Sequence, residues 1–129
     1  MNKDNSRKTI LIVDDTEGIH RTIRRILFNG GNHYNIISAM NCHQAKALLE
    51  KNKVDLVILD INMPEVSGLE FLPSIKKNHP EVPVIVMSGE CDKSIISEAF
   101  KNGCSDYIVK PFDISELHYK VSKLTNMIM

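Results

Sequence analysis

No sign of charge dominates this sequence. Its 129 residues include 16 lysines and arginines and 16 aspartates and glutamates, so the formal net charge at pH 7 is zero. A balanced chain has no overall field that draws it to nucleic acid or to anionic lipid. We therefore expect this segment to bind neither nucleic acid nor a membrane surface.

Long apolar segments are also missing. No stretch approaches the roughly 20 apolar residues that a membrane span needs. Residues 1–8 are polar, and no apolar segment long enough for a signal peptide follows them. We expect a polar N-terminal tail over residues 1–8 and no membrane partner.

Cysteine is scarce and irregularly spaced. Cys42, Cys91 and Cys104 form no CxxC pair, and no histidine cluster lies near them in the sequence. This pattern disfavours both a disulfide framework and a zinc site. We expect the thiols to pack as small apolar side chains and the protein to be cytoplasmic.

Alternating strand and helix patterns fill the rest of the chain, residues 9–129. The expected strands cover 9–14, 34–39, 56–60, 82–88 and 106–110, each followed by a helical pattern. This alternation predicts an α/β fold with a parallel sheet covered on both faces. The expected topology is a flavodoxin-like, doubly wound sheet of order 2-1-3-4-5 with five helices, which places the first and third strands side by side.

Four of the apolar runs end at a polar residue that is able to do chemistry. The residues at these ends are Asp14 with Asp15, Asp60, Ser88 and Lys110. Runs this short and this apolar are typical of strands buried on both faces. Because ligands of open parallel sheets bind beyond the carboxyl ends of the strands, we expect these side chains at one edge.

Three crowded carboxylates keep their ionised forms only beside a compensating cation. Oxygen ligands without histidine or thiolate select a hard ion, and Mg²⁺ fits such a set. A plainer interpretation of Asp14 and Asp15 is a helix N-cap followed by a turn acid. Asp60, at the end of a second buried strand, favours the metal site.

Lys110 and Ser88 also have plain alternatives, as a solvated turn lysine before Pro111 and as an ordinary strand-end hydroxyl. Beside Asp60 and a divalent metal they would instead complete a phosphoryl-transfer site. The carboxylate would attack, the cations would spread the charge of the transferring group, and an aspartyl phosphate would result. This prediction depends on the coincidence of all four strand ends.

Four motifs in order resemble the receiver domain of two-component response regulators, of the chemotaxis-regulator type. They are IVDD at 12–15, LDINMP at 59–64 with Gly68 following, MSG at 87–89 and GCSDYIVKPF at 103–112. The resemblance covers nearly the whole chain, so residues 9–129 are expected to form one receiver domain.

The resemblance implies a role for each matching residue. Asp60 would be the phosphoacceptor, and Ser88 and Lys110 would bind the phosphoryl group. Tyr107 matches the switch aromatic, although a strand residue packed on the last helix is an equal interpretation. The Lys110–Pro111 bond is expected to be cis, as is common in that family.

The resemblance also implies a Mg²⁺ site. Asp15 and Asp60 would bind the ion directly, Asn62 would add its backbone carbonyl, and Asp14 would act mainly through water. The five histidines lie at no strand end, and we expect them to be solvated or partly packed rather than ligands.

The expected function is a regulatory switch, not an enzyme beyond self-phosphorylation and autodephosphorylation. A sensor histidine kinase or a histidine phosphotransfer protein would donate the phosphoryl group. The output surface near 92–101, 106–109 and 113–124 would then bind a downstream protein, an output domain or a second copy as a dimer.

Two alternatives stay open at this point. The chain would equally suit the N-terminal receiver of a longer transcriptional or enzymatic regulator. A Mg²⁺-dependent aspartyl-phosphate phosphohydrolase is disfavoured, because such enzymes need an acid two residues after the nucleophile and Asn62 stands there.

Overall fold

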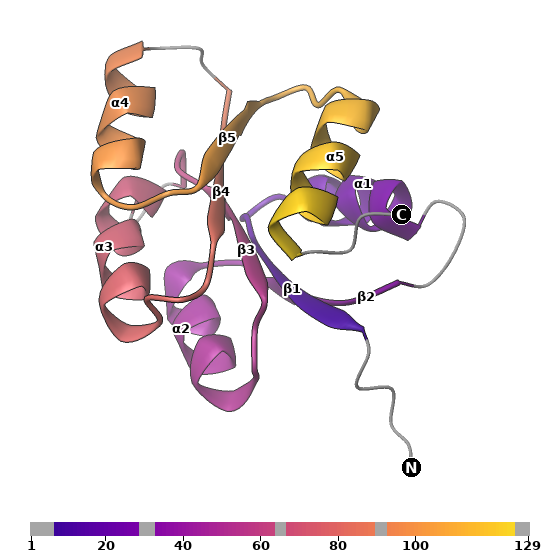
Figure 1. Cartoon of the computed structure of the whole chain (residues 1–129), viewed down its shortest axis with the longest axis horizontal. Coiled ribbons are helices and arrows are strands. Elements are labelled where there is room, and N and C mark those ends of the chain that lie inside the picture. The colour runs from indigo at the N-terminus through magenta and orange to yellow at the C-terminus, as the bar shows by residue number, and fades with distance from the viewer. Residues whose placement is uncertain (1–6, 29–32, 64–66, 90–92, 126–129) are drawn as a thin grey trace.

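Five parallel strands form one sheet with helices on both faces (Figure 1). The computed structural model describes residues 7–28, 33–63, 67–89 and 93–125. The strands are β1 (Lys8–Val13), β2 (Tyr34–Ala39), β3 (Leu56–Asp60), β4 (Val84–Ser88) and β5 (Asp106–Val109). The helices are α1 (Glu17–Phe28), α2 (Cys42–Lys51), α3 (Gly68–Asn78), α4 (Lys93–Lys101) and α5 (Ile114–Thr125). The strand order is β2-β1-β3-β4-β5, which confirms the predicted flavodoxin-like topology.

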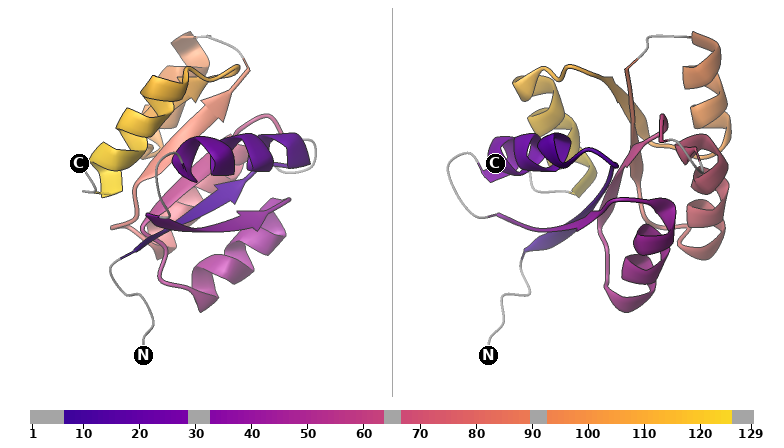
Figure 2. Two further views of the ribbon diagram at one scale, coloured as in Figure 1. Left: turned by 90° about the vertical axis from the view of Figure 1, so that its right-hand side faces the viewer. Right: turned by 180° about the vertical axis from the view of Figure 1, so that it is seen from behind.

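The two faces of the sheet are covered by different helices. Helices α2, α3 and α4 lie on one side, and α1 and α5 lie on the other (Figures 1 and 2). Because successive strand residues point to opposite faces, each strand supplies both cores. Leu11, Val57 and Val86 belong to the core under α2–α4, whereas Ile12, Ile58 and Met87 belong to the core under α1 and α5. Burial on both sides explains why these strands are almost continuously apolar.

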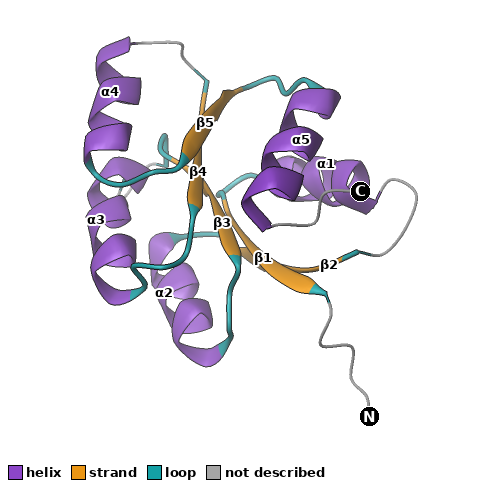
Figure 3. Ribbon diagram, viewed as in Figure 1, coloured by secondary structure: helices purple, strands orange, loops and turns teal. Residues whose placement is uncertain are grey.

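All the strands point the same way, so their carboxyl ends lie along one edge of the sheet. Every pair of neighbouring strands is parallel, and Figure 3 shows a helix after each strand. Val13 of β1 pairs with Leu59 of β3, so the residues that follow this pair are neighbours in space. This register is what brings the polar strand ends together.

Some predicted boundaries were wrong by one or two residues. Strand β1 begins inside the expected tail, because Lys8 pairs with Tyr34 of β2. Strand β4 begins at Val84 rather than at Val82, because the Val82 N–H donates to His79 O at 3.1 Å and Pro83 has no N–H. The expected end of the first helix at residues 29–31 and the expected helical position 128 lie outside the described residues.

Helix α4 ends at Lys101, just before the Asn102–Gly103 pair that the sequence indicated. Gly103 has φ of 104°, a conformation that side chains with a Cβ rarely adopt. The Gly103 N–H donates to Phe100 O and the Cys104 N–H donates to Ala99 O, both at 3.1 Å. These bonds satisfy carbonyls at the helix end and return the chain to β5.

The thiols that the structure describes are packed as expected. Cys104 is buried, and burial, with a smaller contribution from Asp106, raises its pKa to about 11. Cys42 is half-buried against the same core, and burial followed by Glu70 raises its pKa as well. Cys91 lies outside the described residues. Among the described helices, none combines the length and the apolar character that a membrane crossing requires.

Candidate metal and phosphoryl-transfer site

Three aspartates meet at the edge of the sheet where β1 and β3 end. Asp14, Asp15 and Asp60 each offer a carboxylate oxygen, and these oxygens lie within 4.8 Å of one another. Asp14 and Asp60 are almost fully buried, at 0% and 3% exposure, whereas Asp15 is exposed. We call these three residues the acidic cluster.

Lys110 reaches the acidic cluster from the end of β5. Its Nζ lies 3.1 Å from Asp14 Oδ2 and 3.4 Å from Asp60 Oδ2. One ammonium group beside three carboxylates leaves two negative charges unbalanced when all of these groups are ionised. A cation is the natural complement of that excess, because like charges at this spacing otherwise disfavour ionisation.

The environment of Asp60 works against its ionised form. Burial is the main cause that raises the pKa of Asp60 above its ordinary value of 3.8, and the Asp14 carboxylate adds to it. The Asn62 N–H, which donates to Asp60 Oδ1 at 2.9 Å, and Lys110 act in the opposite direction. A bound cation would oppose the effects of burial and of Asp14 and so favour the carboxylate form of Asp60.

Asp14 is held by bonds from several directions. Its N–H donates to Ala39 O of β2 at 3.1 Å, and its Oδ1 accepts the Thr16 N–H at 2.8 Å. Its main-chain oxygen lies 2.8 Å from His20 Nε2. The expectation that the histidines are solvated or partly packed is wrong for His20, which is 4% exposed. The N-cap interpretation of Asp14 accounts for the bond from the Thr16 N–H. It does not account for the burial of Asp14 or for its ion pair with Lys110.

Ser88 lies at the end of β4. This strand lies between β3, which ends at Asp60, and β5, which precedes Lys110. It is buried, and its Oγ lies 3.5 Å from Asn62 Oδ1. The same amide oxygen accepts the Gly89 N–H at 3.3 Å. The Asn62 side chain therefore connects the segment after β3 to the end of β4. The sequence predicted a role for the Asn62 backbone carbonyl and an amide where a phosphohydrolase needs an acid. It did not predict this side-chain connection, which no local pattern indicates.

Gly68 allows the start of α3 to lie directly against the phosphoacceptor candidate. A Cβ at this position would lie 2.7 Å from Ile61 Cα and closer still to Asp60 O. Real Cβ atoms do not approach backbone this closely, so any other residue would displace the helix or the segment after Asp60. The helix begins at this glycine, with Ser67 Oγ accepting the Glu70 N–H at 3.2 Å.

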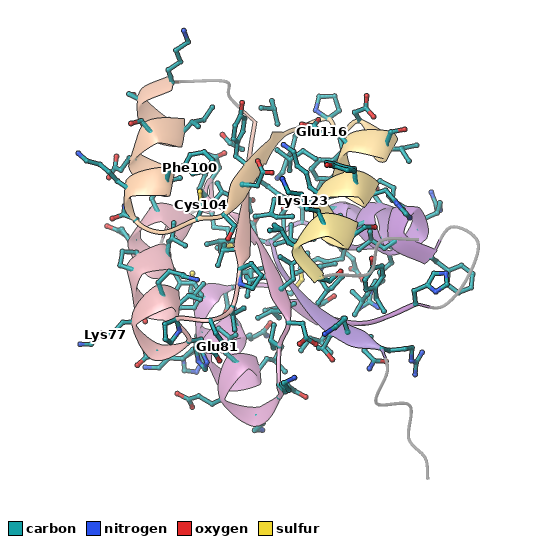
Figure 4. The ribbon with its side chains drawn as sticks, in the orientation of Figure 1. Lys77, Glu81, Phe100, Cys104, Glu116 and Lys123 are labelled. Atoms are coloured by element: carbon teal, nitrogen blue, oxygen red, sulfur yellow. The ribbon has the colours of Figure 1, made fainter. Side chains whose placement is uncertain are left out.

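Tyr107 lies outside the acidic cluster. Its ring meets Phe100 of α4 edge to face, with 6.1 Å between ring centroids, and Lys120 Nζ lies 5.0 Å from the ring centroid. In Figure 4, Phe100 lies on the α4 side of β5 and Glu116 on the α5 side. The Lys110–Pro111 peptide bond is cis, as expected.

The donor set fits a hard divalent ion. The acidic cluster supplies only carboxylate oxygens, and one of its members is exposed enough to be reached from solvent. Mg²⁺ is commonly bound by one or two carboxylates together with water, which such a half-open cluster permits. The acidic cluster is therefore able to hold a metal ion.

Comparisons with known proteins point to one family. The response regulator receiver domain family matches residues 10–122. The transcriptional regulatory protein ZraR of Klebsiella oxytoca is 37% identical over 114 residues, which cover 88% of this chain and 25% of that protein. The transcriptional regulatory protein KdpE of Staphylococcus aureus is 32% identical over 112 residues, which cover 87% of this chain and 47% of that protein.

A solved structure agrees with this result. The signal receiver domain of an HD domain-containing protein from Pseudomonas fluorescens Pf-5 superposes with a TM-score of 0.87 at 28% identity, covering 98% of this chain and 93% of that chain. The present chain spans less than half the length of both curated relatives. Sequence, fold and acidic cluster thus agree, and the chain belongs to the response regulator receiver domain family of two-component systems.

Proposed function

We propose that this protein is a phosphorylation-dependent switch whose Asp60 accepts a phosphoryl group. The observation that supports this most is the meeting of Asp14, Asp15 and Asp60 with Lys110 at one edge of the sheet. Membership in the family implies a histidine kinase as the general class of partner. The specific donor would be a sensor histidine kinase or a histidine phosphotransfer protein.

In the proposed reaction an Asp60 carboxylate oxygen attacks the phosphorus of a phosphohistidine. A new O–P bond forms, the P–N bond breaks, and its electron pair stays with the departing imidazole nitrogen. Lys110, already 3.4 Å from Asp60 Oδ2, would pair with a phosphoryl oxygen. The Ser88 hydroxyl would donate to another.

Asp14, Asp15 and Asp60, with the backbone carbonyl of Asn62, would hold Mg²⁺. When bound, the ion would neutralise charge that develops on the phosphoryl oxygens. The fit of these residues to the ion is supported by their oxygen-only donor set and by their excess of negative charge over Lys110.

A general phosphohydrolase is less well supported. That chemistry needs an acid two residues after the nucleophile, and Asn62 has no proton to give as an acid. Its amide oxygen also accepts hydrogen bonds from Ser88 and Gly89. Receiver domains are typically signalling modules rather than enzymes. We therefore expect self-phosphorylation and autodephosphorylation only.

The output would follow from the added charge. An aspartyl phosphate carries about −1.5 to −2 charges where the carboxylate carried one, so the site gains about one negative charge and three acceptor oxygens. Movement of Ser88 toward the phosphoryl group would be coupled to the Tyr107 ring, and the face formed by α4, β5 and α5 would change its affinity for a partner. That partner would be a downstream protein, an output domain or a second copy of the chain.

The names of the curated relatives suggest a particular context. ZraR and KdpE are described as transcriptional regulatory proteins, and both are longer than this chain. Residues 9–129 would then act as the receiver of a longer regulator. With zero net charge, this segment would not itself bind DNA.

The test is incubation with acetyl phosphate and saturating Mg²⁺, followed by intact-protein mass measurement. Wild type is expected to gain one phosphoryl group, and Asp60→Asn is expected to gain none. Asp55→Asn changes an aspartate near the other end of β3, whose Oδ2 accepts the Thr9 N–H, and should still be modified. A folded wild-type protein that forms no adduct would contradict the proposal, as would equal modification of Asp60→Asn.

A further inference from the structure

His20 is a buried polar residue that the proposed reaction does not use. It lies in α1 with 4% exposure, on the same apolar face as Ile23 and Leu27. Its Nε2 lies 2.8 Å from Asp14 O, and its Nδ1 has no hydrogen-bond partner among the described residues. Because a carbonyl oxygen can only accept, Nε2 must bear the hydrogen and act as donor. A hydrocarbon side chain would fill the same space without leaving a nitrogen unpaired, so packing alone does not account for this residue.

The bond from His20 acts on the peptide unit that joins Asp14 to Asp15. The six atoms of a peptide unit lie close to one plane, so fixing the direction of Asp14 O also fixes the Asp15 N–H and Cα. The other polar groups of Asp14 are already occupied by Ala39, Thr16 and Lys110. The Asp15 side chain, in contrast, is exposed and makes no hydrogen bond or ion pair with the residues that the structure describes. Its position therefore depends on the backbone that leads to it.

We infer that His20 is a positioning residue for the metal site, which sets the backbone of Asp15 by donating a hydrogen bond to Asp14 O. This inference rests on the proposed role of the acidic cluster in holding Mg²⁺. Partners that orient the ligands of a metal without touching it typically change its affinity by about 10- to 100-fold when removed. The main effect is thus on Mg²⁺ affinity, with the fold retained.

The test measures Mg²⁺ affinity by calorimetric titration of the full chain without a phosphoryl donor. His20→Met keeps an apolar side chain of similar length but removes the donor, and its Mg²⁺ dissociation constant is expected to rise about tenfold. His20→Gln places an amide N–H near the position of Nε2 and is expected to stay within about twofold of wild type. This pair separates the hydrogen bond from the volume of the side chain.

A matched variant separates positioning from general destabilisation. Ile23→Ala removes a fully buried side chain one turn further along α1, and it leaves the hydrogen bond to Asp14 in place. It should lower the thermal midpoint while leaving the Mg²⁺ dissociation constant near that of wild type. His20→Met should show the reverse pattern, with weaker Mg²⁺ binding at a thermal midpoint no lower than that of Ile23→Ala.

Wild-type affinity in His20→Met would overturn the inference, as would equal weakening by His20→Met, His20→Gln and Ile23→Ala. The proposed function is judged separately by the acetyl phosphate adduct on Asp60. A protein that binds Mg²⁺ with this dependence on His20 but forms no adduct would retain the inference and lose the phosphoacceptor role. An adduct on Asp60 together with an unchanged Mg²⁺ affinity in His20→Met would retain the phosphoacceptor role and overturn the inference.

Discussion

Two lysine side chains, one after β5 and one in α5, each lie between a pair of carboxylates. Lys110 is bonded to Asp14 and Asp60, whose side chains are 0% and 4% exposed. The third member of the acidic cluster, Asp15, adds a further negative charge beside these two carboxylates. This site holds more negative charge than its lysine balances, and two of its three carboxylates are held away from water.

The second network has one lysine and two carboxylates, so it carries less excess negative charge, and its carboxylates are more exposed. Lys120 Nζ lies 2.9 Å from Glu116 Oε2 and 3.3 Å from Asp106 Oδ1, and these carboxylates are 45% and 26% exposed. It also donates to Tyr107 O at 2.6 Å and lies over the Tyr107 ring. Burial acts to lower the pKa of Lys120, but the hydrogen bonds to Glu116 and Asp106 outweigh it and the pKa is raised. The network therefore favours the charged form of Lys120 and joins α5 to β5.

The difference shows what separates a binding site from a structural ion pair. The fold raises the pKa of Asp60, which means that it disfavours the charge that the proposed reaction needs. At Lys120 the fold favours the charge already present. A larger excess of negative charge, held on buried carboxylates, marks the site that awaits a ligand more than the presence of ion pairs does.

The largest expected effect is that of Lys110→Met, which tests whether the buried network depends on the lysine that pairs with both of its carboxylates. Without Mg²⁺, removing that cation from two buried carboxylates should lower the free energy of unfolding by about 3 kcal/mol. Saturating Mg²⁺ should restore part of the loss, because it again neutralises Asp14 and Asp60. Urea denaturation with and without Mg²⁺ measures both effects. A loss below about 1 kcal/mol, the range of exposed pairs, would remove the contrast between the two networks.

Lys120→Met should have a smaller effect that Mg²⁺ does not change. The loss of charged hydrogen bonds to half-exposed partners is expected to lower the free energy of unfolding by about 1.5 kcal/mol. Because the folded-state pKa of Lys120 is raised, its contribution is fully present below 10.5, the ordinary value, and is lost as pH rises through the higher folded-state value. The gap between wild type and variant in urea denaturation should therefore narrow above pH 10.5. A gap that responds to Mg²⁺ would mean that the two networks are coupled.

The smallest effects should differ in sign between the networks. Without Mg²⁺ at pH 7, Asp60→Asn relieves charge repulsion and should raise the free energy of unfolding by about 1 kcal/mol. Glu116→Gln removes one of the two charged partners of Lys120 and should lower the free energy of unfolding by about 0.5 kcal/mol. Urea unfolding of the two variants and of wild type measures the sign of each change in the free energy of unfolding. Changes of the same sign would contradict the contrast between the two networks.

The pH dependence of the Asp60→Asn effect follows from the raised pKa. A group whose pKa is higher in the folded state contributes stability below its unfolded value, here 3.8, and loses it as pH rises through the folded value. The free energy of unfolding of wild type should therefore be closest to that of Asp60→Asn at low pH. It should fall below that of Asp60→Asn as the pH rises toward neutrality. Urea unfolding at a series of pH values without Mg²⁺ follows this difference, and a constant difference would show that Asp60 does not titrate as argued.

Several parts of the fold could be predicted because local chemistry decides them. The apolar runs predicted the strands, Gly103 predicted the end of α4, and the four polar strand ends indicated one edge of a parallel sheet. Boundaries were less predictable, because Lys8 joins β1 only through a partner in β2. The start of β4 likewise depends on a bond between Val82 and His79 at the end of α3.

The contacts that refine the site could not be read from spacing. Asn62 bonds Ser88 and Gly89, which are more than twenty residues away along the chain. His20 gives no signal in a sequence, since its neighbours in α1 form an ordinary apolar stripe. Its value as a donor depends on the direction of one carbonyl group, which exists only once α1 is packed on the sheet.

The sequence by itself determined which residues stand at the strand ends and therefore which chemistry is available, because strands form where apolar residues cluster and stop where polar ones follow. Only the tertiary structure decided how the charges balance. Strand order places Asp14 beside Asp60, and Lys110 reaches both from β5 across the end of β4. Burial and distance set the pKa of a carboxylate, and both are properties of the packed chain rather than of its order of residues.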